Sequence, residues 1–345
     1  MSYPVMYPGG FEKRDVNMVS RVVVVGTGSI GTRHLHVLRQ MRDAYPVAIS
    51  RRPERAKELA TLGYVTAGDL RVAADMGANF CIIATETSRH VQDALLALES
   101  GLDVLIEKPL AVNAEQARRL CVAAEEKGRR VFVGCCLRFS EPLNTFRALV
   151  GSMGRLHSIR IECQSYLPEW RPARPYQESY SARAVEGGVL RDLIHEIDYA
   201  GWIFGWPKAV QASVRNLGRL GIEADEVAGL MWETEDGCVV SVSLDYLTRP
   251  SRRRMTVMGE WGTLEWDAVE NTITVFPVKD AVRVERSQQT RDAIFLEQDH
   301  AFINTAQGIC DPRLATGQDG VRALAVCDAA RRASASSQQE EVQYQ

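Results

Sequence analysis

The stretch Val22-Val23-Val24-Val25-Gly26-Thr27-Gly28-Ser29-Ile30-Gly31 decides the fold of the first part of this chain. Four valines in a row predict a buried strand, and three glycines in the spacing Gly-x-Gly-x-x-Gly follow it directly. In this motif the first glycine permits a tight turn, the second lets the backbone approach a pyrophosphate, and the third allows close packing of the next helix. The free N–H groups at the start of that helix would face the phosphates. The stretch therefore predicts a dinucleotide-binding turn with contacts from Gly26, Thr27, Gly28, Ser29, Ile30 and Gly31, and a purely structural turn is the alternative.

The alternation of apolar runs and helical patterns continues outward from this turn. Strands are expected at 21–25, 46–50, 79–84, 103–107 and 130–134, and helices at 31–43, 53–62, 87–100 and 113–128. Such strand–helix alternation is typical of a parallel, doubly wound sheet. The predicted fold class is therefore α/β, with an N-terminal Rossmann dinucleotide-binding domain over residues 20–138.

The pattern changes near residue 140, where alternating strands replace the regular helices. Strands are expected at 155–166, 208–216, 226–235, 238–247, 253–259, 262–266 and 271–276, and helices at about 142–150, 187–204 and 316–333. Residues 139–333 are therefore expected to form a C-terminal, substrate-binding α+β domain with a large, mostly antiparallel open sheet. Residues 1–19 and the Ser- and Gln-rich residues 334–345 are expected to be flexible ends.

Composition and charge limit the classes of protein to which the chain can belong. A hydrophobic share of 46%, a charged share of 25% and a net charge of −3 are typical of a soluble globular protein, and they give no reason to expect nucleic acid or an acidic membrane as a partner. The eight cysteines contain no C-x-x-C pair, and no cluster of His, Cys and carboxylate has ligand spacing, so no metal site is expected. We expect a reduced, cytoplasmic protein, because neither a leader nor a membrane-spanning run is evident.

The end of the second predicted strand indicates which dinucleotide is bound. An NAD-dependent enzyme usually carries an acidic residue there to hold the ribose hydroxyls. This chain has Ser50, Arg51 and Arg52 instead, and guanidinium groups bind phosphate oxygens in a bidentate manner. NADP(H) is therefore favoured as the cofactor, and NAD(H) is possible if one arginine stacks on the adenine.

A second motif, Glu107-Lys108-Pro109, directly follows the apolar run Val104-Leu105-Ile106. Together with the glycine motif it makes the chain resemble the Gfo/Idh/MocA oxidoreductase family, which contains glucose–fructose oxidoreductase and inositol dehydrogenase. The resemblance covers about residues 20–333. Its motifs are Gly26–Gly31, Ala84-Thr85 with His90, Glu107-Lys108-Pro109, Val133–Phe139 with Arg138, Gly187-Gly188, Asp192–Asp198 with His195, and Met258–Glu265.

The resemblance implies that Lys108 and His195 bind the substrate and act at the reacting carbon, and that Asp192 supports them. Imidazole titrates in the range useful for taking a hydroxyl proton, and a nearby ammonium stabilises developing alkoxide charge. Asp192 and His195 lie three apart on the helix expected at 187–204 and would share a face, whereas many relatives place the acid four before the histidine. The resemblance also implies cofactor contacts from Thr85, His90, Glu107, Lys108 and Arg138. The alternatives are a solvent-facing Lys108 and a purely structural His195.

A proline-rich segment from Tyr166 to Ser181 lies before the predicted catalytic helix. In it, Trp170 and Tyr176 are candidates to stack on a sugar ring, and Arg171 and Arg174 are candidates to bind a carboxylate or phosphate. The alternative is a surface loop that holds a dimer contact.

The sequence therefore predicts an NAD(P)-dependent dehydrogenase or reductase that transfers a hydride between the nicotinamide and a hydroxyl or carbonyl carbon of a sugar, a sugar derivative or a cyclitol. The alternatives are a non-catalytic dinucleotide-binding sensor or regulator of the same fold, and an NAD-dependent glycosidase. Sensors of this fold usually lose the lysine–histidine pair, which this chain keeps. The resemblance further implies that the C-terminal sheet mediates oligomerisation, as a homodimer or homotetramer.

Overall fold

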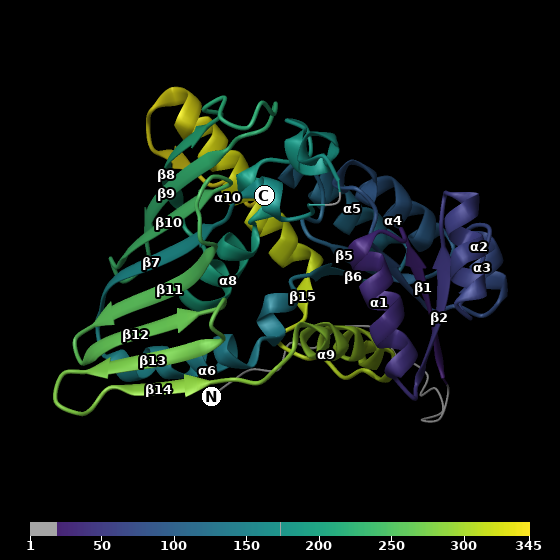
Figure 1. Ribbon diagram of the computed structural model, residues 1–345, viewed down its shortest axis with the longest axis horizontal. Helices are drawn as coiled ribbons and strands as arrows, with labels where there is room; N and C mark the ends of the chain where they lie inside the picture. The colour runs from purple at the N-terminus through teal and green to yellow at the C-terminus, as the bar shows by residue number, and fades with distance from the viewer. Residues whose placement is uncertain (1–18, 173) are drawn as a thin grey trace.

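Two sheets organise the molecule, a seven-stranded one and a nine-stranded one (Figure 1). The structure is a computed structural model that describes residues 19–172 and 174–345. Nearly all of the expected flexible segment 1–19 lies outside the described residues. In Figure 1 the nine-stranded sheet stands at the left and the smaller sheet at the right, with helices between them.

The seven-stranded sheet has the order β15-β6-β5-β4-β1-β2-β3. All of its pairs are parallel except that of β15 with β6. Its strands are β1 (Ser20–Val25), β2 (Ala44–Ile49), β3 (Val65–Thr66), β4 (Phe80–Ile83), β5 (Asp103–Glu107), β6 (Val131–Gly134) and β15 (Ala315–Thr316). Its connecting helices are α1 (Ser29–Gln40), α2 (Pro53–Thr61), α3 (Leu70–Asp75), α4 (His90–Glu99) and α5 (Ala114–Glu126). The predicted doubly wound fold is confirmed, and β3, α3 and β15 are short additions that the apolar pattern did not reveal.

The strand order places the first predicted motifs at one edge of this sheet. From β1 the chain runs outward through β2 and β3, and then returns to β4 on the other side. In such sheets a ligand crevice opens at the carboxyl ends of the strands where the order reverses. Gly26 follows β1, Thr85 comes just after β4 and Lys108 follows β5, so all three lie at that edge.

The nine-stranded sheet has the order β14-β13-β12-β11-β7-β10-β9-β8-β16, and only β7 and β10 pair in parallel. The predicted mostly antiparallel open sheet is therefore confirmed. Its strands are β7 (Leu156–Gln164), β8 (Ala209–Arg215), β9 (Val227–Glu233), β10 (Val239–Asp245), β11 (Arg252–Gly259), β12 (Gly262–Asp267), β13 (Thr272–Pro277), β14 (Arg283–Arg286) and β16 (Glu340–Glu341). Burial alternates along strands such as β9, because one face packs against helices and the other does not. The covering helices are α6 (Glu141–Leu149), α8 (His195–Phe204) and α10 (Gly317–Ser336).

The prediction of a single helix at 187–204 is wrong in one respect, because the helix is interrupted. α7 (Val189–Asp192) and α8 (His195–Phe204) are separate helices with two residues between them. Asp192 therefore ends one helix and His195 begins the next. Their relation depends on this break and does not follow from a shared helical face.

The backbone carbonyl of Asp192 has a different partner at the break from the one that a continuous helix would give it. In a continuous helix it would accept the N–H of Glu196. Instead the ammonium of Lys108 donates to it at 2.7 Å, and the N–H of Glu196 donates to the carbonyl of Leu193 at 3.4 Å. A side chain from the other sheet has replaced one helical hydrogen bond.

Two features of the C-terminal part differ from the sequence-based predictions. α9 (Arg291–Asn304) was not predicted, and it packs on α1 and buries Phe295. The end at 334–345, expected to be flexible, is held against the larger sheet instead. There β16 pairs with β8, and the hydroxyl of Tyr344 donates to the carbonyl of Pro207 at 2.5 Å. Its polar composition concealed this because the contact is made largely by backbone groups.

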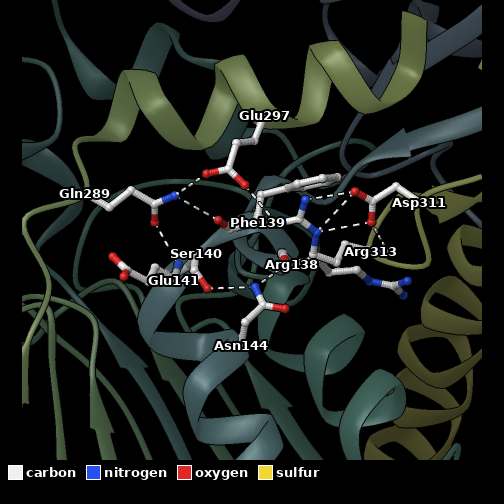
Figure 2. Close-up of polar contacts among 9 residues, drawn as sticks. All are labelled: Arg138, Phe139, Ser140, Glu141, Asn144, Gln289, Glu297, Asp311 and Arg313. Carbon is white, nitrogen blue, oxygen red and sulfur yellow. Dashed lines mark hydrogen bonds and ion pairs between the residues drawn. The ribbon is translucent and has the colours of Figure 1, made fainter. Parts of the chain in front are cut away.

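The link between the sheets is fixed by residues from late in the chain (Figure 2). Arg313 lies over the ring of Phe139 at 4.6 Å and forms ion pairs with Glu297 and Asp311, each at 2.8 Å. The amide of Gln289 donates to the carbonyl of Phe139 at 3.0 Å and to Glu297 at 2.9 Å. The chain segment that leaves β6 is thus held on both sides.

Candidate active site

The glycine turn after β1 has the shape that a pyrophosphate requires. Gly26 has φ 91°, and an added Cβ there would meet the carbonyl oxygen of Ala84 at 2.6 Å. An added Cβ on Gly31 would lie 1.8 Å from the carbonyl oxygen of Gly26. Gly28 forms the N-cap of α1 without a side-chain cap, and an added Cβ there would meet nothing within 4 Å. The amino end of α1 therefore faces open space, and these residues fit a dinucleotide.

The side chains around this turn lie at the edge of the sheet. Thr27 is buried and donates to the hydroxyl of Ser50 at 3.0 Å, which joins the turn to the end of β2. Ser29 is exposed and Ile30 is half-buried on the first turn of α1. Arg51 and Arg52 are exposed, and neither guanidinium has a hydrogen-bond or ion-pair partner within residues 19–172 and 174–345. Both remain available to a ligand.

The structure gives His90 a different place from the one expected. Its ring nitrogens lie 2.8 Å from the carbonyl oxygen of Pro109 and 3.1 Å from that of Thr85, and the residue is 1% exposed. Burial lowers its pKa. His90 is therefore a buried link between two strand ends, which corrects its assignment as a cofactor contact. The hydroxyl of Thr85 donates to Asp93 at 2.9 Å.

Arg138 is also occupied elsewhere. Its side chain is 2% exposed, and its guanidinium donates to Asp198 at 3.0 and 2.7 Å and to Asp319 at 3.3 Å. The expected cofactor contact through this side chain is therefore wrong. The physical reason is that Asp198, in the first turn of α8, anchors the helix on Arg138.

Lys108, Asp192 and His195 come together where the two sheets face each other. Lys108 is half-buried, with its ammonium on the carbonyl of Asp192, while Asp192 and His195 are 3% and 7% exposed. Burial, together with the charges of Lys108, Arg253 and Arg291, lowers the pKa of His195 well below its ordinary value. The imidazole is therefore neutral near pH 7 and able to accept a proton.

The carboxylate of Asp192 is bound by one aromatic hydroxyl and lies near a second. Tyr246 donates to Asp192 Oδ2 at 2.7 Å. The charge of Asp192, followed by burial, raises the pKa of Tyr180, which places that phenol close to the carboxylate. Asp192 Oδ1 and His195 Nδ1 are both buried and have no hydrogen-bond partner among the described residues. Two polar atoms are thus left for water or a substrate.

Only part of the segment from Tyr166 to Ser181 approaches these groups. Trp170 lies edge-on against Tyr246 at 5.3 Å, and Arg171 lies over the ring of Tyr180 at 5.9 Å. Trp170 also donates through its indole N–H to Ser165 at 2.9 Å.

The other two candidates in this segment lie apart. The hydroxyl of Tyr176 donates to the carbonyl of Leu220 at 3.0 Å and its ring is half-buried, so its contact with a substrate stays a prediction. Arg174 is exposed, and no contact joins it to Asp192 or His195 within the described ranges 19–172 and 174–345.

Four residues near the site escaped the sequence analysis. They are Tyr180 at the start of a short 3-10 helix, Tyr246 directly after β10, Arg253 on β11 and Arg291 at the start of α9. Arg253 Nε lies 2.8 Å from Glu196 Oε1, so that guanidinium is paired. Of the four, only Tyr180 gave a usable signal, because it belongs to the same proline-rich segment as Trp170.

No helix within the described ranges 19–172 and 174–345 is long and apolar enough to cross a bilayer. Residues 20–135 match the family model described as "Oxidoreductase family, NAD-binding Rossmann fold", and residues 147–265 match the "GFO/IDH/MocA C-terminal domain". The two matches fall on the two sheets.

Similar sequences and similar solved structures are known for this chain. The rhizopine catabolism protein MocA of Rhizobium meliloti is 28% identical over 328 residues, which cover 90% of this chain and 93% of that protein. A myo-inositol 2-dehydrogenase of Thermotoga maritima is 26% identical over 336 residues, covering 90% of this chain and 95% of that protein. The structure of a levoglucosan dehydrogenase in complex with NADH has a TM-score of 0.85 at 20% identity, covering 94% of this chain and 99% of that chain.

Proposed function

Because this chain belongs to the Gfo/Idh/MocA oxidoreductase family, we propose that Lys108 and His195 carry the proton-transfer part of its reaction. The protein is an NAD(P)-dependent oxidoreductase. It acts on a CH–OH group of a sugar, a sugar derivative or a cyclitol, or on the corresponding carbonyl. The observation that supports the proposed roles is the meeting of the Lys108 ammonium with Asp192 beside a neutral, buried His195.

The bound nicotinamide supplies or accepts the hydride. The amino end of α1 would hold the pyrophosphate, because its N–H groups face open space at Gly28. Glu107 ends β5 beside Lys108 and would contact the nicotinamide end of the cofactor. Thr85 follows β4 at the same edge of the sheet, and its backbone would lie against that end.

The proton is handled by His195. Its neutral ring accepts the proton of the substrate hydroxyl when an alcohol is oxidised, and returns it when a carbonyl is reduced. The ammonium of Lys108 donates to the substrate oxygen and stabilises its developing negative charge. Each of these effects commonly contributes about two to four orders of magnitude in rate.

Asp192 has two tasks in this proposal. Its backbone carbonyl directs the ammonium of Lys108, and its buried Oδ1 is free to accept a hydrogen bond from a substrate hydroxyl. Tyr246 fixes the other carboxylate oxygen. Trp170 and Arg171 would line the outer side of the substrate site, since they contact the tyrosines around Asp192.

NADP(H) is the preferred cofactor in this proposal. The 2′-phosphate of NADP(H) would lie at the end of β2, where Arg51 and Arg52 are exposed and Ser50 offers a hydroxyl. An acidic residue that could hold the ribose hydroxyls is absent from these three positions.

We also propose that the chain forms a homodimer or homotetramer through the open face of the nine-stranded sheet. Met231, Val239 and Phe276 are exposed on strands of this sheet. Light scattering coupled to size-exclusion chromatography tests this, and a monomer across the micromolar range would contradict it.

The reaction is tested by a substrate panel. Free, phosphorylated and nucleotide-linked sugars and cyclitols are each incubated with NAD and with NADP, and the absorbance at 340 nm is followed. Steady, substrate-dependent change of cofactor absorbance is expected. A sensor would give none, and a glycosidase that recycles its cofactor would release a sugar without net absorbance change.

A further inference from the structure

Three charged side chains lie buried behind the proposed nicotinamide site. His34 comes from α1, Glu107 from the end of β5 and Asp299 from α9. The side chains of His34 and Asp299 are 0% exposed, and that of Glu107 is 11% exposed. We refer to these three residues as the buried triad. Nothing in the proposed proton transfer uses His34 or Asp299.

The imidazole of His34 connects the two acids. Its Nδ1 lies 2.9 and 2.8 Å from the two carboxylate oxygens of Asp299, and its Nε2 lies 3.1 Å from Glu107 Oε1. A neutral imidazole has one N–H group, so only the protonated ring can donate to both ionised acids. Burial lowers the pKa of His34, but the charges and hydrogen bonds of Asp299 and Glu107 outweigh it and raise the pKa to about 10.

The position of Glu107 is also limited by the neighbouring strand. An added Cβ on Gly134 of β6 would lie 2.7 Å from Glu107 Oε1, so the carboxylate rests against the backbone there. The other charged and titratable groups around the triad include Arg33 with its partner Asp292, and Arg291, Lys108, Cys136, His90 and Tyr180. None of these groups donates a hydrogen bond to the side chain of Glu107 within the described part of the chain, whereas His34 does.

We propose that Asp299 is a positioning residue of the nicotinamide site, which acts through His34 to hold the carboxylate of Glu107 beside Lys108. The inference rests on the proposed contact between Glu107 and the cofactor. Asp299 keeps the imidazole protonated, and the imidazolium gives Glu107 a charge-assisted hydrogen bond, which is roughly twice as strong as a neutral one. A helix from late in the chain thereby sets the geometry of a site formed early in it.

The first test needs no substitution. The chain contains six histidines, and nitrogen NMR of the ¹⁵N-histidine-labelled protein, with His34→Gln for assignment, reports the protonation of each ring. His34 is expected to stay an imidazolium from about pH 6 to about pH 9. A His34 ring that is neutral at pH 7 would overturn the proposal.

The second test is direct binding of NADPH, followed by its fluorescence without substrate. In Asp299→Asn we expect His34 to lose its proton near neutral pH and NADPH to bind about tenfold more weakly at about pH 8.5. Binding should recover to within about twofold at about pH 6, where the ring of His34 is protonated again. A purely structural defect would not recover on acidification. ADP, which lacks the nicotinamide, should bind equally to both proteins.

Asp43→Asn is the matched control, because Asp43 faces His300 at 3.5 Å on the surface with both side chains about half exposed. It should bind NADPH as the unsubstituted protein does. Glu107→Gln separates the two proposals. If Glu107→Gln binds NADPH normally, the proposed cofactor contact fails and the role of Asp299 fails with it. If Glu107→Gln weakens binding and Asp299→Asn does not at about pH 8.5, only the role of Asp299 is overturned.

Discussion

The side chain of Lys108 contacts the backbone carbonyl of Asp192 and not its carboxylate. The ammonium of Lys108 lies 2.7 Å from the carbonyl oxygen of Asp192, at the point where α7 ends. This leaves the carboxylate of Asp192 free to be fixed by Tyr246. It also joins the end of β5 in the nucleotide-binding sheet to the interrupted helix over the other sheet, so the two halves of the site have a direct mechanical connection.

Replacement of Lys108 tests the proposed role of the ammonium. In Lys108→Met we expect kcat to fall by about two to four orders of magnitude, because the developing alkoxide loses its cation. The Kd of NADPH should change little. Lys208→Met is the control, since Lys208 pairs with Glu235 at the surface with more than three quarters of each side chain exposed. Near-normal kcat in Lys108→Met would remove the lysine from the chemistry.

The pH dependence of kcat/KM tests His195. Burial, then Lys108, Arg253 and Arg291, lower its pKa below the ordinary 6.5, so the base stays deprotonated and active until the pH falls below that value. The acid limb of the profile should therefore lie below about pH 6.5 and vanish in His195→Asn. An exposed histidine on β7, changed in His157→Asn, should leave the limb in place. A limb centred above pH 7 would contradict the assignment.

The lowered pKa of His195 also determines how the free energy of unfolding changes with pH. The folded state resists protonation of His195 more than the unfolded chain does, so its contribution to stability is complete above pH 6.5 and is lost as the pH falls toward the lowered pKa. Denaturant titrations between about pH 7 and about pH 5 should show a smaller loss in His195→Asn than in the unsubstituted protein.

Tyr246 provides a test of how Asp192 is held. Tyr246→Phe removes the donor to a buried carboxylate oxygen, and a hydrogen bond to a charged group contributes about 1.5–3 kcal/mol. We expect kcat/KM to fall by about ten- to hundredfold. Tyr176→Phe is the matched control, because its hydroxyl donates to the carbonyl of Leu220 and not to Asp192. Equal losses of activity in both variants would refute a specific role for Tyr246.

The glycine turn and the Glu107-Lys108-Pro109 motif could be predicted from the sequence because their geometry is local. A glycine with positive φ at position 26 and an added-Cβ clash at Gly31 are properties of a few neighbouring residues. The strands and most helices followed from apolar spacing for the same reason. The helix break after Asp192 could not be predicted, because the group that binds the freed carbonyl of Asp192 is Lys108, which lies far away in the sequence.

The missed and misassigned residues are all decided by tertiary contacts. Arg138 and His90 lie within motifs typical of the family. In the folded chain, however, Arg138 forms an ion pair with Asp198, and the ring nitrogens of His90 contact two backbone carbonyls. Tyr246 carries no local signal, because only the packing of β10 against α7 brings it to Asp192. Spacing in a sequence shows which residues are close along the chain, and these pairs are close only in space.

Cofactor preference is tested at the end of β2. In Arg51→Ala we expect the KM for NADP(H) to rise by about tenfold or more, since a guanidinium–phosphate contact is lost, while the KM for NAD(H) stays constant. Arg119→Ala is the control, because that arginine is 78% exposed on α5 and, among the residues that the structure describes, pairs with Glu115 alone. An unchanged KM for NADP(H) in Arg51→Ala would return the cofactor assignment to NAD(H).

Arg138 distinguishes a structural role from a cofactor contact. Arg138→Leu leaves Asp198 buried without its partner, and breaking a buried ion pair from one side costs about 3–5 kcal/mol of unfolding free energy. The double variant Arg138→Leu with Asp198→Leu removes both charges, so it should recover a large part of that loss in a denaturant titration. If Arg138 held the cofactor instead, the double variant would fold well and still bind NADPH poorly. We expect the Kd of NADPH for the double variant to stay within about twofold of normal, because the guanidinium is committed to Asp198 and Asp319.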